Sequence, residues 1–326
     1  MRYGDHQGAT GYLIGEPHQG LAYMFTMMNH ARLQVGLQGV AVSQRSLQQA
    51  SDYAHERIQG RTLLAGTSGG PSPIALHPDV QRMLLSMQAR TQAMRALALE
   101  AATELDLSSQ SDKTAALKAQ TRVDLLIPIV KGWCTEQSVE ISSLGVQIHG
   151  GMGYIEETGI GQLWRDARIT PIYEGTTAIQ ANDLIGRKIL RDQGAAMSEL
   201  VNEIRDTATT LATSQDKHLA RLGQQIEQGA ATLQASVRWC LETANKDTAA
   251  VYFGSVPMLM LAGYVLGGWM MGRSALACQE SHHTIDPQLG RTQTRLALVY
   301  GDLALVPSLG LSHAITSACD VLATRE

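Results

Sequence analysis

A long proline-free stretch follows Pro17 and most strongly constrains the fold. It reads LAYMFTMMNHARLQVGLQGVAVSQRSLQQASDYAHERI, in which Leu21, Met24, Met28 and Val35 recur at three- and four-residue spacing. This spacing is typical of one face of an α-helix, because side chains of a strand alternate between its two faces. The stretch therefore predicts one long amphipathic helix, which must bury its apolar face against other elements.

Three further helical stretches predict a bundle. Turn-forming text, GTSGGPSP at residues 66–73, separates the first helix from the second, and Pro128 is expected to kink the third. The approximate bounds of these three helices are 79–105, 113–148 and 176–190. Helices that each carry one apolar stripe bury it by packing on one another, so residues 20–190 predict an all-α four-helix bundle.

The composition shifts to Ala, Thr and Gln after the text RDQGAAM, and a second helical domain is expected there. Its predicted helices cover about 197–214, 216–245, 248–279, 288–304 and 311–324. The N-terminal text ATGYLIGEP is strand-like, but it is too short to make a sheet alone.

Residues 248–272 carry no charged side chain and are numerous enough to cross a bilayer. Pro257 and several glycines interrupt this run, and small residues permit close approach of another backbone. We interpret the run as a helix buried in the protein or at a subunit interface, with a membrane span as the alternative.

Charge and cysteine usage narrow the class of protein. The chain has 26 basic and 30 acidic side chains and no basic run, so we expect no nucleic-acid partner. The N-terminus lacks the charged and then apolar segments of a signal peptide, and we expect a cytoplasmic protein without a membrane partner.

His282 and His283 are interpreted as a solvated pair, and no metal site is expected. The cysteines follow no CxxC spacing and are expected to be reduced thiols: Cys134, Cys240, Cys278 and Cys319.

Two motifs admit both a structural and a functional interpretation. In QIHGGMGY, residues 147–154, the glycines are either a helix C-cap or a place where backbone N–H groups approach a pyrophosphate. In RDARITPIYEGTTAIQ, Glu174 is either a favourable charge near a helix that Thr176 or Thr177 caps, or a functional carboxylate.

Together these motifs resemble the C-terminal signature of the acyl-CoA dehydrogenase family. LGVQIHGGMGYIEETG and LWRDARITPIYEGTTAIQ stand in the family's order and spacing, and the text after Pro17 is similar to the family's first bundle helix. The continuation to residue 326 is similar to the larger branch of the family, which has an extra C-terminal helical domain. The resemblance implies a remnant of the middle β domain at 1–18, the bundle at 19–192 and the helical extension at 193–326.

The resemblance also implies a reaction. Glu174 matches the base that removes the α-proton of an acyl-CoA thioester while a hydride passes from the β-carbon to N5 of FAD, giving the trans-2-enoyl-CoA. A weakly acidic proton requires a carboxylate held against it in a site that excludes water. In the family, the backbone N–H of the same glutamate helps to stabilise the thioester oxygen. Gly175 matches the residue that lets the thioester lie close, and Thr176 matches a flavin contact.

Other positions match less directly. Gln147, Gly150 and Gly151 match residues that hold FAD across a dimer interface, and Arg57 matches the arginine near the FAD diphosphate. Arg32 matches an arginine of the acyl-CoA site; on an apolar stripe it needs a partner such as CoA or a carboxylate. The chain departs from the family at Gly60, where an aromatic residue is common, and at Asn29, where an acidic residue of the substrate site is common.

The chain matches only the later part of the family, because the N-terminal helical domain and most of the β domain precede the matched region. A fragment, a split gene with a partner chain and a misplaced start codon remain open. The resemblance implies a homodimer and an electron-transferring flavoprotein as electron acceptor. The alternatives are a truncated, inactive helical fragment and a helical assembly module.

Overall fold

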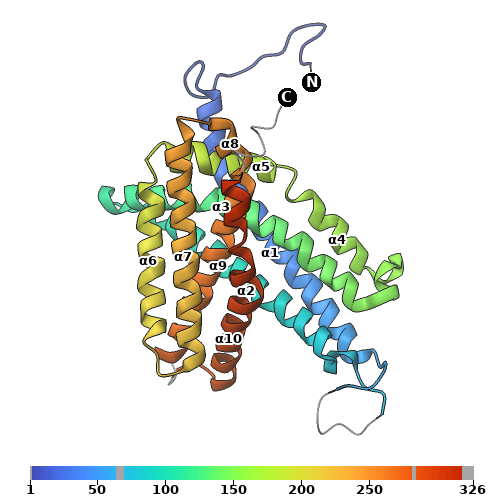
Figure 1. Cartoon of the computed structure of the whole chain (residues 1–326). Helices are drawn as coiled ribbons and strands as arrows, with labels where there is room; N and C mark the ends of the chain where they lie inside the picture. The colour runs from blue at the N-terminus through green and yellow to red at the C-terminus, as the bar shows by residue number, and fades with distance from the viewer. Residues whose placement is uncertain (1, 64–69, 281–283, 318–326) are drawn as a thin grey trace, which may run out of the picture.

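The computed structural model describes residues 2–63, 70–280 and 284–317, and this part of the chain is almost entirely helical (Figure 1). The N-terminal elements are α1 (Gly20–Glu56), α2 (Pro78–Leu107), α3 (Lys113–His149), η2 (Gly150–Tyr154), α4 (Ile160–Ile169), α5 (Thr177–Asp183) and η4 (Leu184–Leu190). The C-terminal elements are α6 (Ala195–Ala212), α7 (Lys217–Ala244), α8 (Thr248–Phe253), α9 (Ser255–Glu280), α10 (Pro287–Tyr300), η5 (Gly301–Leu305), α11 (Val306–Ser308) and α12 (Leu311–Thr316). The predicted all-α class is confirmed.

The differences from the predicted elements are local. α3 continues through Pro128 as one helix, and a short helix that the sequence did not predict, α4, lies between the glycine loop and Glu174. The predicted helix at 248–279 is divided at Gly254 into α8 and α9, because α8 ends there. Cys319, His282 and His283 lie outside the described residues.

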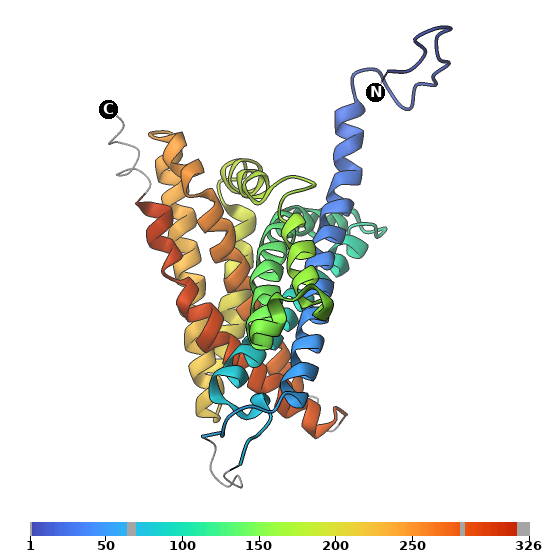
Figure 2. The ribbon, with the colours of Figure 1, turned by 90° about the vertical axis from the view of Figure 1, so that its right-hand side faces the viewer.

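The N-terminal segment forms no strand among the residues described. Residues 2–19 are exposed, and Figure 2 shows this segment and the first turns of α1 projecting beyond the other helices. Leu21, Met24 and Met27 are correspondingly exposed on α1. The strand-like residues 9–17 form no sheet here, as expected for a stretch too short to make one alone, and their origin as a β-domain remnant stays a prediction.

α1 and α3 run in the same direction in close contact. A Cβ added at Gly36 would lie 2.6 Å from a methyl group of Val130, and one at Gly39 would lie 2.8 Å from the Cys134 carbonyl oxygen. Further along the pair, the rings of Tyr53 and His149 stack with centroids 4.2 Å apart. The absence of side chains at the two glycines lets the helices approach closely enough to bury their shared face.

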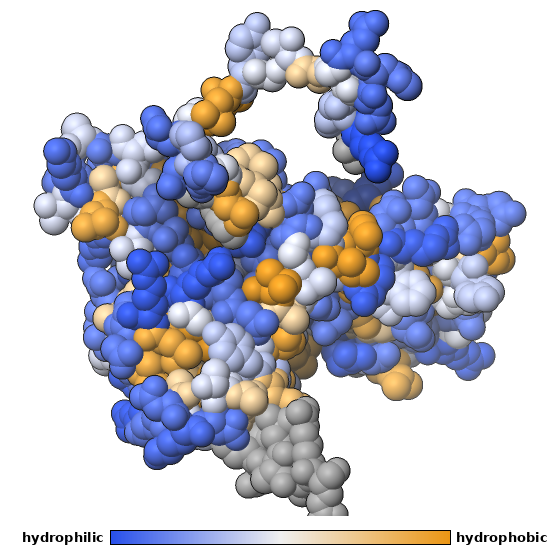
Figure 3. All heavy atoms as spheres, turned by 90° about the horizontal axis from the view of Figure 1, so that it is seen from above, coloured by the Kyte–Doolittle hydropathy of each residue, from blue (hydrophilic) through white to orange (hydrophobic). Residues whose placement is uncertain are grey.

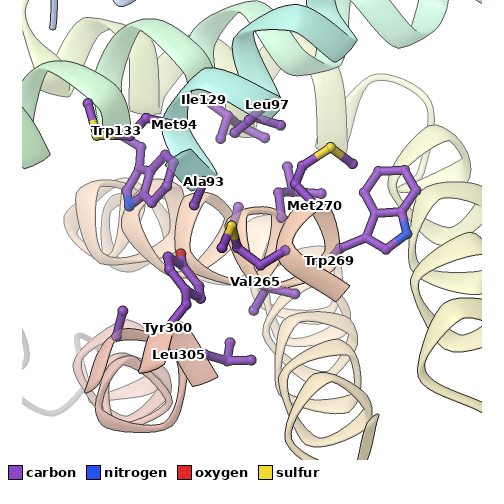
Figure 4. Packing of buried hydrophobic residues seen from close by; sticks show 14 of the residues in the cluster. Ala93, Met94, Leu97, Ile129, Trp133, Val265, Trp269, Met270, Tyr300 and Leu305 are labelled. Atoms are coloured by element: carbon purple, nitrogen blue, oxygen red, sulfur yellow. The ribbon is translucent and has the colours of Figure 1, made fainter. Parts of the chain in front are cut away.

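α9 is the central helix of the C-terminal part, and it packs against α2 and α3 as well as α6, α7, α10 and α12. Figure 4 shows Trp133 of α3 and Tyr300 of α10 directed at it. A Cβ at Gly263 would lie 2.2 Å from the Trp133 ring, and one at Gly267 would lie 2.2 Å from the Tyr300 hydroxyl oxygen. One buried apolar cluster therefore continues across residues 192 and 193, where the sequence predicts a domain boundary.

Two helical stretches are long and apolar enough, by length and composition, to cross a membrane: Ser255–Glu280 and Pro287–Thr316. In the first, 78% of the most apolar stretch is buried inside the protein, against 33% in the second. Burial against α3 and α7 accounts for the uncharged run of the first, as the interpretation of a buried helix predicts.

Gly39 provides a test of the α1–α3 contact. Gly39→Ala is expected to lower the free energy of unfolding by about 1–3 kcal/mol, because the new methyl group meets backbone atoms that cannot rotate away. Gly290→Ala in α10 is the matched control, since its added Cβ has no neighbour closer than 4.0 Å and the substitution favours the helix by up to about 1 kcal/mol. Urea unfolding of both variants measures the difference; equal shifts would contradict the close contact.

Candidate active site

Glu174 lies in a strained turn between α4 and α5. Its φ is 56°, in the left-handed region that non-glycine residues rarely adopt, and Gly175 follows with a φ of 88°. Such a conformation costs about 1–2 kcal/mol for a residue with a side chain. A Cβ at Gly175 would lie 2.8 Å from Nε2 of Gln180, so this position requires glycine. The half-buried Glu174 therefore owes its placement to contacts elsewhere in the fold.

Side chains from α3 and α5 hold the turn. Gln180, fully buried, donates through Nε2 to the carbonyl oxygens of Glu174 (3.3 Å) and Gly175 (3.2 Å). Lys131 of α3 donates through Nζ to the Gly175 carbonyl at 2.7 Å. Two residues after Gly175, the Thr177 hydroxyl donates to a carboxylate oxygen of Glu136 on α3 at 2.5 Å. The backbone around Glu174 is thus anchored to α3 at two points.

Lys131 is fully buried. The pKa of its ammonium group is lowered to about 8, chiefly by burial and also by Arg32, against the opposing effect of the Glu136 and Glu174 carboxylates. Its hydrogen-bond acceptor, a main-chain carbonyl, carries no full charge to offset the cost of burying a cation. A buried cation beside the predicted base makes this turn a candidate functional site.

Arg32 and Asn29 lie one helical turn apart on α1. Arg32 is buried and pairs with Asp183 of α5 at 3.3 Å, and its Nε has no partner among the described atoms. Asp183 is therefore a carboxylate partner for Arg32 within the chain, one of the two partners expected for it. Asn29 is half-buried, and with Arg32 it belongs to the same end of the bundle as Glu174.

Thr176 is the N-cap of α5. Its hydroxyl oxygen accepts from the backbone N–H of Ile179 at 3.3 Å, which is one of the two capping alternatives that the sequence offered. Thr176 is exposed next to Glu174, and the side chains of Ile172 and Ile179 on either side of the turn are 46% and 49% exposed. The surface around the carboxylate is therefore open and partly apolar.

The remaining predicted residues gather at the other end of α1 and α3. Gly150 is the C-cap of α3 with a φ of 61°, Gly151 follows it, and both are exposed with no atom within 4 Å of an added Cβ. Arg57 is the exposed C-cap of α1, and Gln147 is exposed in the last turn of α3. The stacked rings of Tyr53 and His149 join the two helix ends, which meet in Figure 1.

The structure therefore divides the predicted site residues into two groups. Glu174, Gly175, Thr176, Arg32 and Asn29 lie near Lys131, whereas the other four lie near Gly150. At 1.5 Å per helical residue, the stretch of α3 from Lys131 to Gly150 is about 28 Å long. The two groups do not share one cavity within this chain.

A groove elsewhere contains none of these residues. It has a volume of about 730 Å³ and lies between α2, α3 and the C-terminal helices, with Arg90, Glu140 and Tyr264 among its lining residues. Arg90 is buried and pairs there with Glu140 at 2.8 Å.

A family model described as the acyl-CoA dehydrogenase C-terminal domain matches residues 18–190. The chain belongs to the acyl-CoA dehydrogenase family. A second model, described as acetyl-CoA dehydrogenase C-terminal like, matches residues 200–324. These matches confirm the resemblance that the glycine and glutamate motifs indicated.

Among proteins of known function, the chain is 45% identical over 321 residues to 3-methylmercaptopropionyl-CoA dehydrogenase of Ruegeria pomeroyi, covering 98% of this chain and 54% of that protein. It is 34% identical over 291 residues to the broad-specificity linear acyl-CoA dehydrogenase FadE5 of Mycobacterium tuberculosis, covering 84% of this chain and 46% of FadE5. The chain thus spans about half the length of these curated relatives.

Two solved structures share the fold. Caenorhabditis elegans ACDH-11, in complex with C11-CoA, superposes with a TM-score of 0.71 at 22% identity, over 90% of this chain and 46% of that one. An acyl-CoA dehydrogenase from Bacillus anthracis, complexed with FAD, gives 0.70 at 20% identity, over 96% and 51%. At these identities the comparison shows the helical architecture alone.

Sequence reasoning missed Lys131 and Gln180, which hold the turn. A signal for Lys131 was present: it is the one charged residue in LLIPIVKGWCT, residues 125–135, where periodicity alone predicts a buried helix. A lysine at such a position is buried only when an acceptor meets it. For Gln180 the sequence offers no comparable signal, because a glutamine early in a helix is usually exposed.

Burial of Lys131 predicts a pH dependence of stability. Below pH 8 this lysine is charged in both states, and the folded protein bears the full cost of burying the charge. Between about pH 8 and 10.5 the unfolded chain binds more protons, so the free energy of unfolding should rise with pH by on the order of 3 kcal/mol.

Urea unfolding at pH 7.5, 9 and 10.5 measures this rise. In Lys131→Met, the free energy of unfolding should rise with pH by about 3 kcal/mol less than in wild type. Lys118→Met is the control: its rise should be unchanged or slightly larger, because the pKa of exposed Lys118 is raised, not lowered, by its hydrogen bond to Glu199. Identical pH profiles for wild type and Lys131→Met would contradict a buried, charged Lys131.

Proposed function

We propose that this chain is the helical part of an FAD-dependent acyl-CoA dehydrogenase in which Glu174 removes the α-proton of an acyl-CoA thioester to give the trans-2-enoyl-CoA. The observation that supports this most strongly is the turn itself. In a chain of this family, the carboxylate at the predicted base position sits on a strained backbone that Lys131 and Gln180 hold in place. A carboxylate that only favoured a helix start would need no such strain.

The residues of the turn suit proton abstraction. A base works when it is held within hydrogen-bond reach of the proton, and anchoring of the Glu174 and Gly175 carbonyls limits the movement of this base. The backbone N–H of Glu174 would stabilise the thioester oxygen. FAD, when bound, would supply the acceptor for the hydride from the β-carbon.

The glycine loop fits a nucleotide. Open space lies beside Gly150 and Gly151, so a diphosphate can approach this part of the backbone, although the Gly150 N–H itself donates to the Gln147 carbonyl. The Arg57 guanidinium lies exposed at the same end. Gln147 completes this group, while Thr176 belongs to the group about 28 Å away along α3. We therefore propose that two copies of the chain form a homodimer in which each FAD meets Thr176 of one copy and the glycine loop of the other.

We further propose that the acyl pocket is completed by a wall outside the described residues. The apolar side chains of Ile172 and Ile179 are half exposed around Glu174, and the acyl chain needs apolar surface on both sides. Asn29 and Arg32 would contribute to the acyl-CoA site from α1. The name of the Ruegeria pomeroyi relative makes 3-methylmercaptopropionyl-CoA the first thioester to test. Electron-transferring flavoprotein and the cytoplasm are proposed as electron acceptor and location.

Glu174→Gln tests the proposed base. The chain is co-expressed with the N-terminal half of the Ruegeria pomeroyi relative, and dehydrogenation is followed with an artificial electron acceptor. Glu174→Gln is expected to lower turnover by at least about a hundredfold, because the amide cannot take the proton, with little change in thioester binding. The helical content of the variant should equal that of wild type.

Glu242→Gln is the matched control, because this glutamate is exposed on α7. It should keep full turnover and the yellow colour of bound flavin. Retained turnover in Glu174→Gln would reject the base. A colourless assembly in all three proteins would favour a helical assembly module, and a colourless aggregate would favour an inactive fragment.

A further inference from the structure

Lys131 is a buried cation that donates a hydrogen bond to the residue directly after the proposed base. We propose that Lys131 is a positioning residue: its ammonium group anchors the Gly175 carbonyl and thereby holds Glu174 in the left-handed conformation that the base requires. This inference rests on the proposed function of Glu174, but the anchoring itself is a property of the chain alone.

The turn has few other anchors. Glu174 and Gly175 both have positive φ, and the acceptors that fix them are their own two carbonyl oxygens. Gln180 shares one amide group between these oxygens at 3.3 and 3.2 Å, whereas Lys131 makes a shorter bond of 2.7 Å to one of them. A charge-assisted hydrogen bond is about twice as strong as a neutral one. Lys131 therefore makes the shortest side-chain hydrogen bond to the two carbonyl oxygens of the turn.

The position of Lys131 on α3 makes this anchor rigid. Its neighbours Val130 and Cys134 meet Gly36 and Gly39 of α1, and Trp133 meets Gly263 of α9. The part of α3 that carries Lys131 is thus packed between α1 and α9. A hydrogen bond from the Lys131 side chain therefore ties the turn to a closely packed part of the core. An exposed lysine on a mobile segment could not do this.

The charge of Lys131 is also coupled to the base. The groups that act on it are Glu136 of its own helix, Arg32 of α1 and Glu174 of the turn. Two of the three are carboxylates and favour the ammonium form, while burial and Arg32 oppose it. Because burial lowers the pKa of Lys131 to about 8, the anchor weakens and the turn loses a nearby positive charge as pH rises above that value.

The first experiment uses the chain alone. Backbone amide hydrogen exchange is measured for a peptide that covers residues 172–179, where the Thr177 N–H donates to the Pro171 carbonyl. Lys131→Met keeps the length and apolar stem of the side chain but removes the donor, so exchange there should be about tenfold faster. Lys118→Met, at an exposed position of the same helix, should leave it unchanged. Equal protection in wild type and Lys131→Met would overturn the anchor.

The second experiment uses the chain joined to the N-terminal half. Turnover in Lys131→Met should fall at least about tenfold with KM changed far less, since the base is misplaced while the thioester still binds. In wild type, kcat should decline above pH 8, and Lys131→Arg, which stays charged, should lose this decline. The same alkaline decline in Lys131→Arg and wild type would overturn the proposal.

The two proposals fail separately. Turnover retained in Glu174→Gln would reject the base, whereas the exchange result for residues 172–179 would still report on the anchor. Conversely, an inactive Glu174→Gln with a fully active Lys131→Met would leave the base in place and reject Lys131 as its positioning residue.

Discussion

Close packing around one turn of α3 is the constraint on which the rest of this structure depends. Val130 and Cys134 pack against Gly36 and Gly39 of α1. On the other side of α3, Trp133 packs against Gly263 and Gly267 of α9, and Leu259 of α9 packs against Gly132. Lys131, within the same five residues, reaches the turn that carries Glu174. The α1 side of the bundle, the C-terminal helices and the candidate active site are therefore positioned from one place.

This arrangement connects stability with the proposed chemistry. A positive φ at Glu174 and a buried ammonium at Lys131 each cost free energy, and both costs fall at the same turn. Burial of apolar surface in the surrounding core offsets these costs, because α1 and α9 both pack apolar side chains against α3. The surface beside the turn is different, because Ile172 and Ile179 are 46% and 49% exposed there. Figure 3 shows apolar side chains in separate groups among polar ones on the side where the N-terminal segment lies.

The sequence predicted the fold better than the site. Three-residue and four-residue periodicity located α1, α2 and α3 to within a few residues, because an amphipathic stripe is a local property. The motif around Glu174 identified the family, which the family model confirms. Periodicity could not reveal which helices would touch, so the pairing of Gly36 and Gly39 with α3 was not foreseen. Lys131 escaped for the same reason, since its partner is a main-chain carbonyl 44 residues away. Gln180 lies close in sequence to its partners, but a glutamine early in a helix is usually exposed. The functional roles of all the predicted site residues, Glu174 included, stay predictions.

The central claim is that the Glu174 carboxylate is held where it can take a proton from the α-carbon of a thioester. Exchange of that proton with solvent tests it most directly. An acyl-CoA is incubated in D₂O with the chain joined to its N-terminal half, and no electron acceptor is added. The mass of the thioester is then measured by mass spectrometry. The account predicts incorporation of deuterium at the α-carbon with wild type and none above background with Glu174→Gln. Equal incorporation with both proteins would contradict it.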